Sequence, residues 1–329
     1  MSHKKKIYFR ADANAEIGMG HVIRSIALAT MLKDEFSCTL YTRFPSSFIA
    51  TECQAASIDL VYLKEKEGSH TNFLSSLSGD EIVVLDNYFF GTAFQKKIKS
   101  KGCALVCIDD LHEIHFLADL VINHNPAAKK QHYSVGQETR LLLGLDYVLL
   151  RKPFLNEHQR TANRHMQIST VFLCFGGSDL YGLTLKYMNY LLERTSYHVI
   201  AVLGNAVVID ELNLKIDEKR LSIHQGLNQS QMVDQINKSD LAIIPSSSIL
   251  FEVIALKKPF VTGFYVENQK EISSHFASLD SRIVLGNLNE INVDKLQHMF
   301  THFHEYPLDI LDQIDGKSQQ RYIEEFKSL

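Results

Sequence analysis

The chain has 329 residues, of which 45% are hydrophobic and 22% charged, and its formal net charge is −4 at pH 7. This length exceeds what one small core needs, so two domains are expected. A helix that spans a bilayer needs about eighteen or more consecutive apolar residues, and the sequence has no such run. Positive and negative residues are interspersed without an extended basic face. We therefore expect neither a membrane nor a nucleic acid as partner.

The cysteines and the first residues indicate a cytoplasmic protein. The five cysteines, an odd number, lie mostly in apolar segments and are expected to be reduced and buried. Cys103 and Cys107 are four residues apart, but no second pair follows at the spacing of a zinc site, so we expect no metal. The opening MSHKKKIYFRADA lacks the apolar core of a signal peptide, so we expect no export.

Short apolar runs alternate with helix-like segments along almost the whole chain, the pattern of βα units and a parallel sheet. In the first half, Ile23, Ile26, Ala27, Met31 and Leu32 follow the spacing of one buried helix face. Strands rich in Val, Ile, Leu and Tyr, as a sheet covered on both faces requires, are predicted at 6–12, 38–44, 58–63, 81–88, 104–111 and 118–125.

A polar stretch near residues 156–168 interrupts this alternation, which restarts as if a new domain began. Strands are then predicted at 171–177, 198–204, 221–227, 241–247 and 259–265, with helices at 182–195, 229–240 and 248–257. We place the domains at 1–157 and 158–329, and expect helices after Pro307 to pack across the junction. The predicted fold class is α/β, with two Rossmann-like, doubly wound parallel-sheet domains facing a ligand-binding cleft.

The first candidate site follows the first strand, in ADANAEIGMGHVIRSIALA. Gly18 and Gly20 allow a turn with positive φ, His21 begins the helix, and Arg24 lies one turn further on. Free N–H groups at a helix start suit polar ligands. The helix dipole disfavours the imidazolium form, so His21 is expected to stay neutral and can serve as a general base. Alternatively, His21 only caps the helix and the glycines only serve the turn.

The segment VFLCFGGSD repeats this arrangement at the first strand of the second domain. Gly176, Gly177 and Ser178 can bring backbone N–H donors to a phosphate. Asp179 is either part of this ligand site or the cap of the next helix.

Polar residues also follow two later strands of the second domain. In LAIIPSSSILFEVIAL, Ser246–Ser248 offer hydroxyls and helix-end N–H groups for a diphosphate, and Glu252 can accept two hydrogen bonds from a ribose diol. Alternatively, the serines are caps and Glu252 is a solvated helix residue. Asn268 and Gln269 follow the strand at 259–265, where their amides suit sugar hydroxyl or acetamido groups, although such a pair is often only a turn.

In the first domain, EIVVLDNYFF ends a buried strand in Asp86 and Tyr88, which can orient a sugar or a water. Asp109 and Asp110 end the next strand, and we favour capping over metal binding for them. No GxSxG elbow and no cysteine–histidine pattern supports covalent acyl chemistry. The expected mechanism is direct displacement.

Together, RADANAEIGMGHVIRSIALA, VVLDNY, CIDDL, ADLVINHN, LLGLDYVLLRKPF, FGGSD, PSSS, FEVIALKKPF and ENQ resemble the family of UDP-2,4-diacetamido-2,4,6-trideoxy-β-L-altropyranose hydrolases of pseudaminic acid biosynthesis. The resemblance runs from Arg10 to about Gln269. It implies a glycosyltransferase-B-like fold and metal-independent attack of water on the anomeric carbon, with C–O cleavage, inversion and release of UDP. Leu180 departs from the family, since many relatives have proline after GGSD.

The resemblance also implies roles for the candidate residues. His21 matches the proposed base, Tyr88 and Asn268 match polar residues near the sugar, and Gly177–Asp179, Ser246–Ser248 and Glu252 match the UDP-binding half. The candidate catalytic residues are therefore His21, Tyr88 and Asn268. The candidate substrate-binding residues are Arg10, Asp12, Gly18, Gly20, Arg24, Asp86, Gly176, Gly177, Ser178, Asp179, Ser246, Ser247, Ser248, Glu252 and Gln269.

The expected partner is a UDP-sugar, and no cofactor is required. No heptad pattern or large apolar stripe indicates a fixed dimer, so we expect a monomer. Two other functions fit the same residues. One is a glycosyltransferase that passes the sugar to a hydroxyl acceptor, and the other is a catalytically silent UDP-sugar-binding protein.

Overall fold

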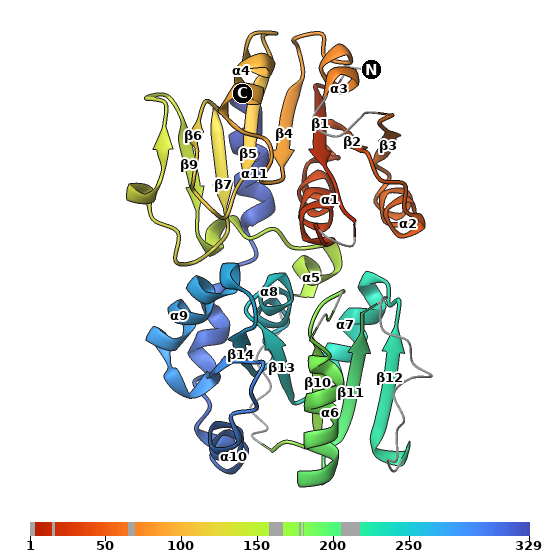
Figure 1. The fold of residues 1–329 in the computed structure, drawn as a ribbon, viewed down its shortest axis with the longest axis vertical. Coiled ribbons are helices and arrows are strands. Elements are labelled where there is room, and N and C mark those ends of the chain that lie inside the picture. The colour runs from red at the N-terminus through yellow and green to blue at the C-terminus, as the bar shows by residue number, and fades with distance from the viewer. Residues whose placement is uncertain are drawn as a thin grey trace. The chain divides into compact units, whose positions relative to one another are not determined.

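The computed structural model describes residues 4–14, 17–64, 70–157, 167–177, 179, 181–204 and 218–329. Within these residues, runs of buried aliphatic side chains form the strands. The chain divides into two units, residues 1–152 with 317–329, and residues 153–316. Figure 1 labels the elements of each unit. The predicted division after residue 157 falls at the end of helix α5 (Lys152–Glu157). The final residues, which we assigned to the second domain with a C-terminal helix that crosses back, are grouped with the first unit.

The described part of the first unit holds a seven-stranded sheet whose strands are all parallel, in the order β3-β2-β1-β4-β5-β7-β9. Its strands are β1 (Lys6–Ala11), β2 (Ser37–Thr42), β3 (Asp59–Tyr62), β4 (Ile82–Asp86), β5 (Ala104–Ile108), β7 (Leu120–Asn123) and β9 (Arg140–Leu143). Every residue of β4 is buried, as expected for a strand covered on both faces. A small second sheet pairs β6 (His115–Phe116) with β8 (Ser134–Val135).

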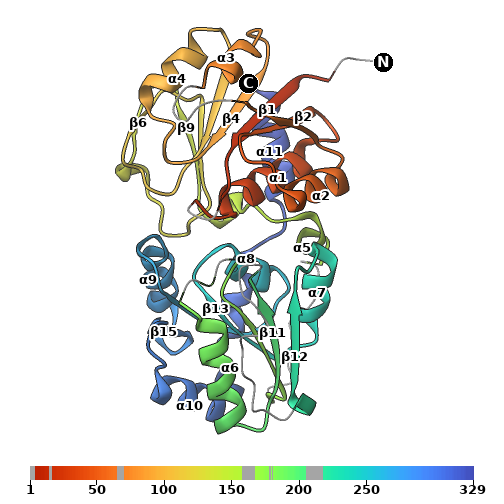
Figure 2. The same ribbon diagram turned by 45° about the vertical axis from the view of Figure 1, so that its right-hand side comes forward.

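Helices α1 (Gly20–Leu32), α2 (Ser47–Ala56), α3 (Thr71–Ser75) and α4 (Thr92–Lys99) connect the first strands, and 3-10 turns lie at Lys130–His132 and Leu145–Tyr147. The last helix, α11 (Ser318–Lys327), lies beside α1 in both views (Figure 1 and Figure 2). Phe326 of α11 meets the edge of Phe36, and the Tyr322 hydroxyl donates to the Tyr147 carbonyl. These contacts hold the end of the chain on the first unit.

The second unit repeats the winding, with parallel strands in the order β12-β11-β10-β13-β14-β15. They are β10 (Thr170–Cys174), β11 (His198–Leu203), β12 (Leu221–Gln225), β13 (Leu241–Pro245), β14 (Phe260–Phe264) and β15 (Val284–Asn287). The helices are α6 (Leu183–Arg194), α7 (Gln229–Asn237), α8 (Ser248–Ala255), α9 (Lys270–Leu279) and α10 (Val293–Thr301), with 3-10 turns at Glu218–Arg220, Glu267–Gln269 (η5), Ser281–Ile283, Phe303–Glu305 and Leu308–Gln313.

Each sheet has one point at which the strand order reverses. In the first unit it lies between β1 and β4, and in the second between β10 and β13. In open α/β sheets, ligands bind outside the carboxyl ends of the strands at such a point. The register pairs Ala11 with Asp86, so the loop after β1 and the polar end of β4 lie side by side.

Candidate functional site

The loop after β1 brings His21 to the reversal point of the first sheet. Gly18 has φ +78°, a conformation that favours glycine, and its N–H donates to the Asn14 carbonyl at 2.9 Å. Met19 occupies the N-cap of α1 without a side-chain cap hydrogen bond. His21 is 6% exposed, in the first turn of the helix. The turn predicted at Gly18 and Gly20 therefore places an imidazole at the carboxyl edge of the sheet.

A buried carboxylate fixes the tautomer of His21. The Nδ1 atom lies 2.7 Å from Oδ1 of Asp86, which is fully buried. A nitrogen and a carboxylate oxygen at this distance require a proton between them, because two acceptors would repel. A terminal nitrogen of Arg24 also lies 3.1 Å from this Nδ1. Because the contact with Asp86 is the shorter of the two, we assign the Nδ1 proton to the hydrogen bond with Asp86, and in the neutral imidazole Nε2 then carries the lone pair. Among the described residues, no hydrogen bond engages Nε2. This is the arrangement by which an aspartate orients a histidine base.

Arg24 holds this carboxylate in place. Its Nε donates to Oδ2 of Asp86 at 2.7 Å, and one terminal nitrogen donates to Oδ1 at 2.6 Å. The other terminal nitrogen donates to Asp110 at 2.9 Å. Burial by itself raises the pKa of the Asp86 carboxyl, but Arg24 and His21 outweigh it and hold the pKa below its ordinary value. Asp86 is thus held as an ionised, oriented acceptor for Nδ1–H.

Tyr88 covers the histidine from the exposed side. Its ring meets the His21 ring edge-on, with centroids 4.7 Å apart and an interplanar angle of 84°. Its hydroxyl donates to Oδ2 of Asp110 at 3.2 Å, and the residue is 48% exposed. Oδ1 of Asp110 is buried and has no hydrogen-bond partner among the described residues. The structure thus brings together four of the candidate residues, His21, Arg24, Asp86 and Tyr88, and places Asp110 beside them.

His124, which sequence reasoning did not select, follows β7 near this cluster. Burial and the positive charge of Arg24 lower the pKa of its imidazole to about 4. Its Nδ1 accepts the Leu149 N–H at 3.2 Å, which requires a neutral ring nitrogen. The signal in the sequence was a histidine directly after a buried strand at the carboxyl edge.

Arg10 and Asp12, predicted to bind substrate, are both fully buried and paired with each other at 2.6 and 3.0 Å. Asp12 also accepts the backbone N–H and Nε of Arg43, and its own N–H donates to Asn87 at 2.7 Å. Burial raises the pKa of the Asp12 carboxyl, but Arg10 and Arg43 more than offset it, and the pKa is lowered. These contacts brace the ends of β1, β2 and β4 beneath the site.

In the second unit, the loop after β10 approaches the end of β11 closely. Gly176 has φ +92°, and Gly177 is exposed. A Cβ at Gly204 would lie 2.2 Å from the Gly177 carbonyl oxygen, so only glycine fits there. Asp179 caps α6, because its two oxygens accept the N–H groups of Leu183 and Thr184 at 2.8 and 2.9 Å. The capping alternative is therefore the one observed, while Ser178 and Leu180 lie outside the described residues.

The three serines after β13 occupy different environments. Ser246 is fully buried, and its hydroxyl bonds the Thr262 hydroxyl at 2.9 Å. Ser247 is the N-cap of α8 and makes no side-chain cap hydrogen bond, and Ser248 is exposed. Glu252 is buried within α8. Of this group, Ser247, Ser248 and the N–H groups that begin α8 are placed to receive a polar ligand at the second reversal point.

The pair after β14 also divides into one exposed and one buried residue. Asn268 is exposed in η5, whereas Gln269 is buried and its Oε1 accepts the Tyr265 N–H at 3.1 Å. The Tyr265 hydroxyl donates to the Phe175 carbonyl at 3.2 Å, which ties this loop to the glycine loop after β10. Gln269 therefore supports the loop, and Asn268 presents its amide to solvent.

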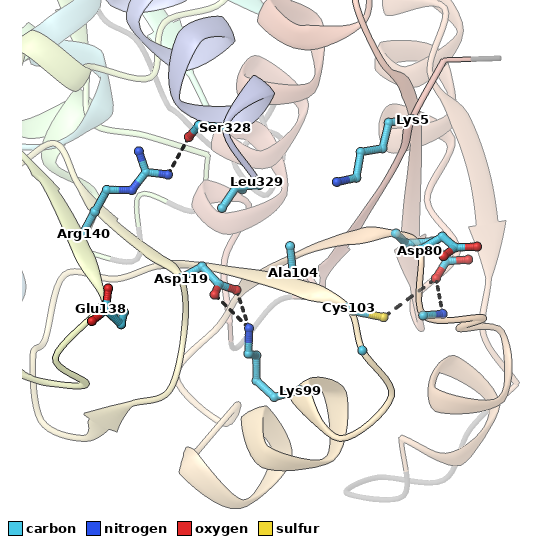
Figure 3. A pocket seen from close by; sticks show the side chains of 13 residues that line it. Lys5, Asp80, Lys99, Cys103, Ala104, Asp119, Glu138, Arg140, Ser328 and Leu329 are labelled. Carbon is cyan, nitrogen blue, oxygen red and sulfur yellow. Dashed lines mark hydrogen bonds and ion pairs between the residues drawn. The ribbon is translucent and has the colours of Figure 1, made fainter. Parts of the chain in front are cut away.

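A polar pocket of about 720 Å³ lies at the amino end of the first sheet (Figure 3). Two of its basic side chains are paired, Lys99 with Asp119 at 2.6 Å and Arg140 with Glu325 and Ser328. Because parallel sheets bind ligands at the opposite edge, we do not assign this pocket to the site.

The described helices include none with the length and apolar character to cross a membrane. Within the same residues, no group of three or more His, Cys, Asp or Glu could hold a metal.

The chain was compared with protein-family models, curated proteins and solved structures. No protein-family model matches the chain. It is 26% identical over 286 residues to UDP-2,4-diacetamido-2,4,6-trideoxy-β-L-altropyranose hydrolase of Campylobacter jejuni, which covers 83% of this chain and 96% of that protein. The predicted resemblance is thereby confirmed. The chain is also 24% identical over 307 residues to the spore coat polysaccharide biosynthesis protein SpsG of Bacillus subtilis, covering 91% of this chain and 89% of that protein.

The structure of Acinetobacter baumannii MurG superposes with a TM-score of 0.62 at 11% identity, covering 99% of this chain and all of that one. The chain has the glycosyltransferase-B fold. The predicted fold class, two Rossmann-like units with parallel sheets, is confirmed.

Proposed function

We propose that the chain hydrolyses a UDP-linked 2,4-diacetamido-2,4,6-trideoxy sugar to the free sugar and UDP. The observation that carries the proposal is the buried His21–Asp86 pair, 2.7 Å apart at the reversal point of the first sheet. The similarity to the C. jejuni hydrolase over most of both chains supports this substrate.

In the proposed reaction, Nε2 of His21 takes a proton from a water as its oxygen bonds to the anomeric carbon. The bond between that carbon and the UDP oxygen breaks, the configuration inverts, and UDP leaves as an anion. Asp86 stabilises the imidazolium that forms, and Arg24 keeps Asp86 ionised.

The second unit is proposed to bind UDP. Ser247, Ser248 and the N–H groups that begin α8 offer donors for the diphosphate, as does Gly177 in the glycine loop. Donors of this kind stabilise the charge that develops on the leaving group. Asn268 is proposed to contact the sugar through its exposed amide.

The test is release of UDP, followed by ³¹P NMR, from UDP-2,4-diacetamido-2,4,6-trideoxy-L-altrose without added metal or acceptor. Wild type is expected to release UDP and reducing sugar, and His21→Gln to be about 10²- to 10⁴-fold slower with UDP affinity retained. The glycosyltransferase-B fold favours a transferase as the second candidate. Release that begins only when a hydroxyl acceptor is supplied would refute the hydrolase and support the transferase.

A further inference from the structure

A small cavity of about 60 Å³ opens at the carboxyl ends of β4 and β5, next to Tyr88. Its floor is formed by apolar side chains that are almost completely buried, namely Leu85, Phe90, Cys107 and Phe116. The partly buried Ile114 and Leu111 form part of its wall. The exposed Tyr88 and Glu113 stand at its rim. A ligand group inside the cavity would therefore meet mainly apolar side chains.

The two amides that line the cavity do not change this character. Oδ1 of Asn87 accepts the Asp12 N–H at 2.7 Å, and its Nδ2 donates to the Asp12 carbonyl at 3.3 Å. Oε1 of Gln95 accepts the Leu117 N–H at 2.8 Å, and its Nε2 donates to the Phe90 carbonyl at 3.3 Å. Both ends of each amide thus have partners in the protein, so the interior of the cavity suits an apolar occupant.

Tyr88 connects this cavity to the proposed reaction centre. Its ring is part of the cavity lining and also meets the His21 ring at 4.7 Å. The cavity and His21 therefore lie on either side of the same tyrosine ring. Asp109 also lines the cavity, with Oδ2 accepting the His112 N–H at 2.8 Å. Burial raises the pKa of the Asp109 carboxyl, and the nearby Asp110 raises it further.

The volume sets the size of the occupant. It is several times the roughly 10–15 Å³ that a single water needs, and far below the roughly 300 Å³ of a pocket for a whole small ligand. A group of a few heavy atoms fits, and a sugar ring does not. Among the groups on the proposed substrate, an acetamido group combines this size with an apolar end.

We propose that this cavity receives the methyl end of one acetamido group, while the amide stays at the rim beside Tyr88. The cavity would then select sugars acetylated at one position over those that are not. This inference rests on the proposed function for its substrate. The group can come from C2 or from C4 of the sugar, and the two sources share the same chemistry.

The test compares the parent UDP-2,4-diacetamido sugar with two analogues, one with N-formyl in place of N-acetyl at C2 and one at C4. Each analogue lacks a single methyl group. For wild type, one analogue is expected to lose about tenfold or more in kcat/KM, because one methyl in an apolar pocket is worth this much. The other is expected to stay within about threefold, and the position of the sensitive analogue identifies the source.

Two matched variants control for packing. Ile114 and Leu74 are both partly buried and packed on the same core cluster, but only Ile114 lines the cavity. Ile114→Phe is expected to fill the cavity, to lower kcat/KM for the parent about tenfold, and to erase the difference between the parent and the sensitive analogue. Leu74→Phe is expected to keep that difference. UDP affinity should be the same in both variants.

Binding of the same three compounds to His21→Gln, measured by calorimetry, separates the two proposals. If wild type hydrolyses all three with equal kcat/KM and they bind equally, the subsite is refuted and the hydrolase stands. If wild type hydrolyses none but the binding preference holds and disappears in Ile114→Phe, the hydrolase is refuted and the subsite stands. If none is bound or hydrolysed, both are refuted.

Discussion

Replacing Asp86 by asparagine tests whether the buried carboxylate orients His21. In the native chain, one oxygen of Asp86 receives Nδ1–H of His21 and a terminal N–H of Arg24, and the other receives Nε–H of Arg24. An asparagine has one acceptor and one donor where these hydrogen bonds need two acceptors. If its NH₂ faces His21, it donates to Nδ1, forces the proton onto Nε2, and also meets the terminal N–H donor of Arg24. If its NH₂ faces Nε of Arg24, two donors meet.

Both orientations are costly, and the first removes the base. An aspartate-to-asparagine change that flips the tautomer of a catalytic histidine costs about 10⁴-fold in kcat, and we expect a loss of about 10³- to 10⁴-fold here. Breaking a buried ion pair costs about 3–5 kcal/mol. We expect the low end, because Arg24 keeps its hydrogen bond to Asp110 at 2.9 Å.

The assay is single-turnover UDP release, together with urea unfolding and UDP binding. Glu81→Gln is the matched control, since Glu81 is 2% exposed, precedes the same strand β4 at its other end, and accepts the N–H groups of Ser78 and Gly79. This variant should lose stability but keep activity within about threefold. If Asp86→Asn stays folded and within tenfold of wild type, the orientation of His21 by Asp86 does not matter, and the reasoning is refuted.

Three further changes test other parts of the structure. Gly204→Ala should weaken UDP binding about tenfold by displacing the Gly177 carbonyl, which lies 2.2 Å from the added Cβ, and unchanged affinity in calorimetry would contradict this. Asp179→Ala should lower the free energy of unfolding in urea by about 1–2 kcal/mol, because α6 loses the carboxylate that accepts its first N–H groups. An unchanged free energy of unfolding would show that these hydrogen bonds do not stabilise the helix. For His124, the folded-state pKa of about 4 lies below the ordinary 6.5, so its contribution to stability is complete above pH 6.5 and is lost as the pH falls toward 4. Between pH 6.5 and pH 4 the free energy of unfolding of wild type should fall by roughly 3 kcal/mol. His124→Gln, which keeps an acceptor for the Leu149 N–H, should show a smaller fall. Urea unfolding over this pH range checks the prediction, and an equal fall in both proteins would contradict the role of His124.

The repeated βα pattern was enough to predict the fold class and the central strands, because those strands are covered on both faces and read as continuous apolar runs. Of the edge strands, β3 and β12 were predicted, whereas β9 and β15 were missed. β9 and β15 are short and carry polar or glycine residues, such as Arg140 and Gly286, so they lack that signal. The pairing of α11 with α1 depends on contacts between residues far apart in sequence, such as Phe36 and Phe326, which no local pattern encodes.

The candidate site divides in the same way. A glycine turn before His21 and an acidic strand end at Asp86 are local signals, and parallel pairing brings them together. Which polar residues face a ligand is a different question. Ser246 and Gln269 look like site residues in the sequence but point into the protein, because neighbouring loops supply their hydrogen-bond partners. His124 was missed for the converse reason, since its place in the cluster depends on how β7 is ordered in the sheet.

In the proposed reaction, the decisive step is the activation by His21, oriented by Asp86, of a water that attacks the anomeric carbon. The most direct measurement is a single turnover of the UDP-2,4-diacetamido-2,4,6-trideoxy sugar in H₂¹⁸O, with the products weighed by mass spectrometry. We expect ¹⁸O at the anomeric position of the released sugar and not in UDP, at a rate that falls in His21→Gln. Label in the phosphate of UDP, or release that His21→Gln leaves unchanged, would contradict it.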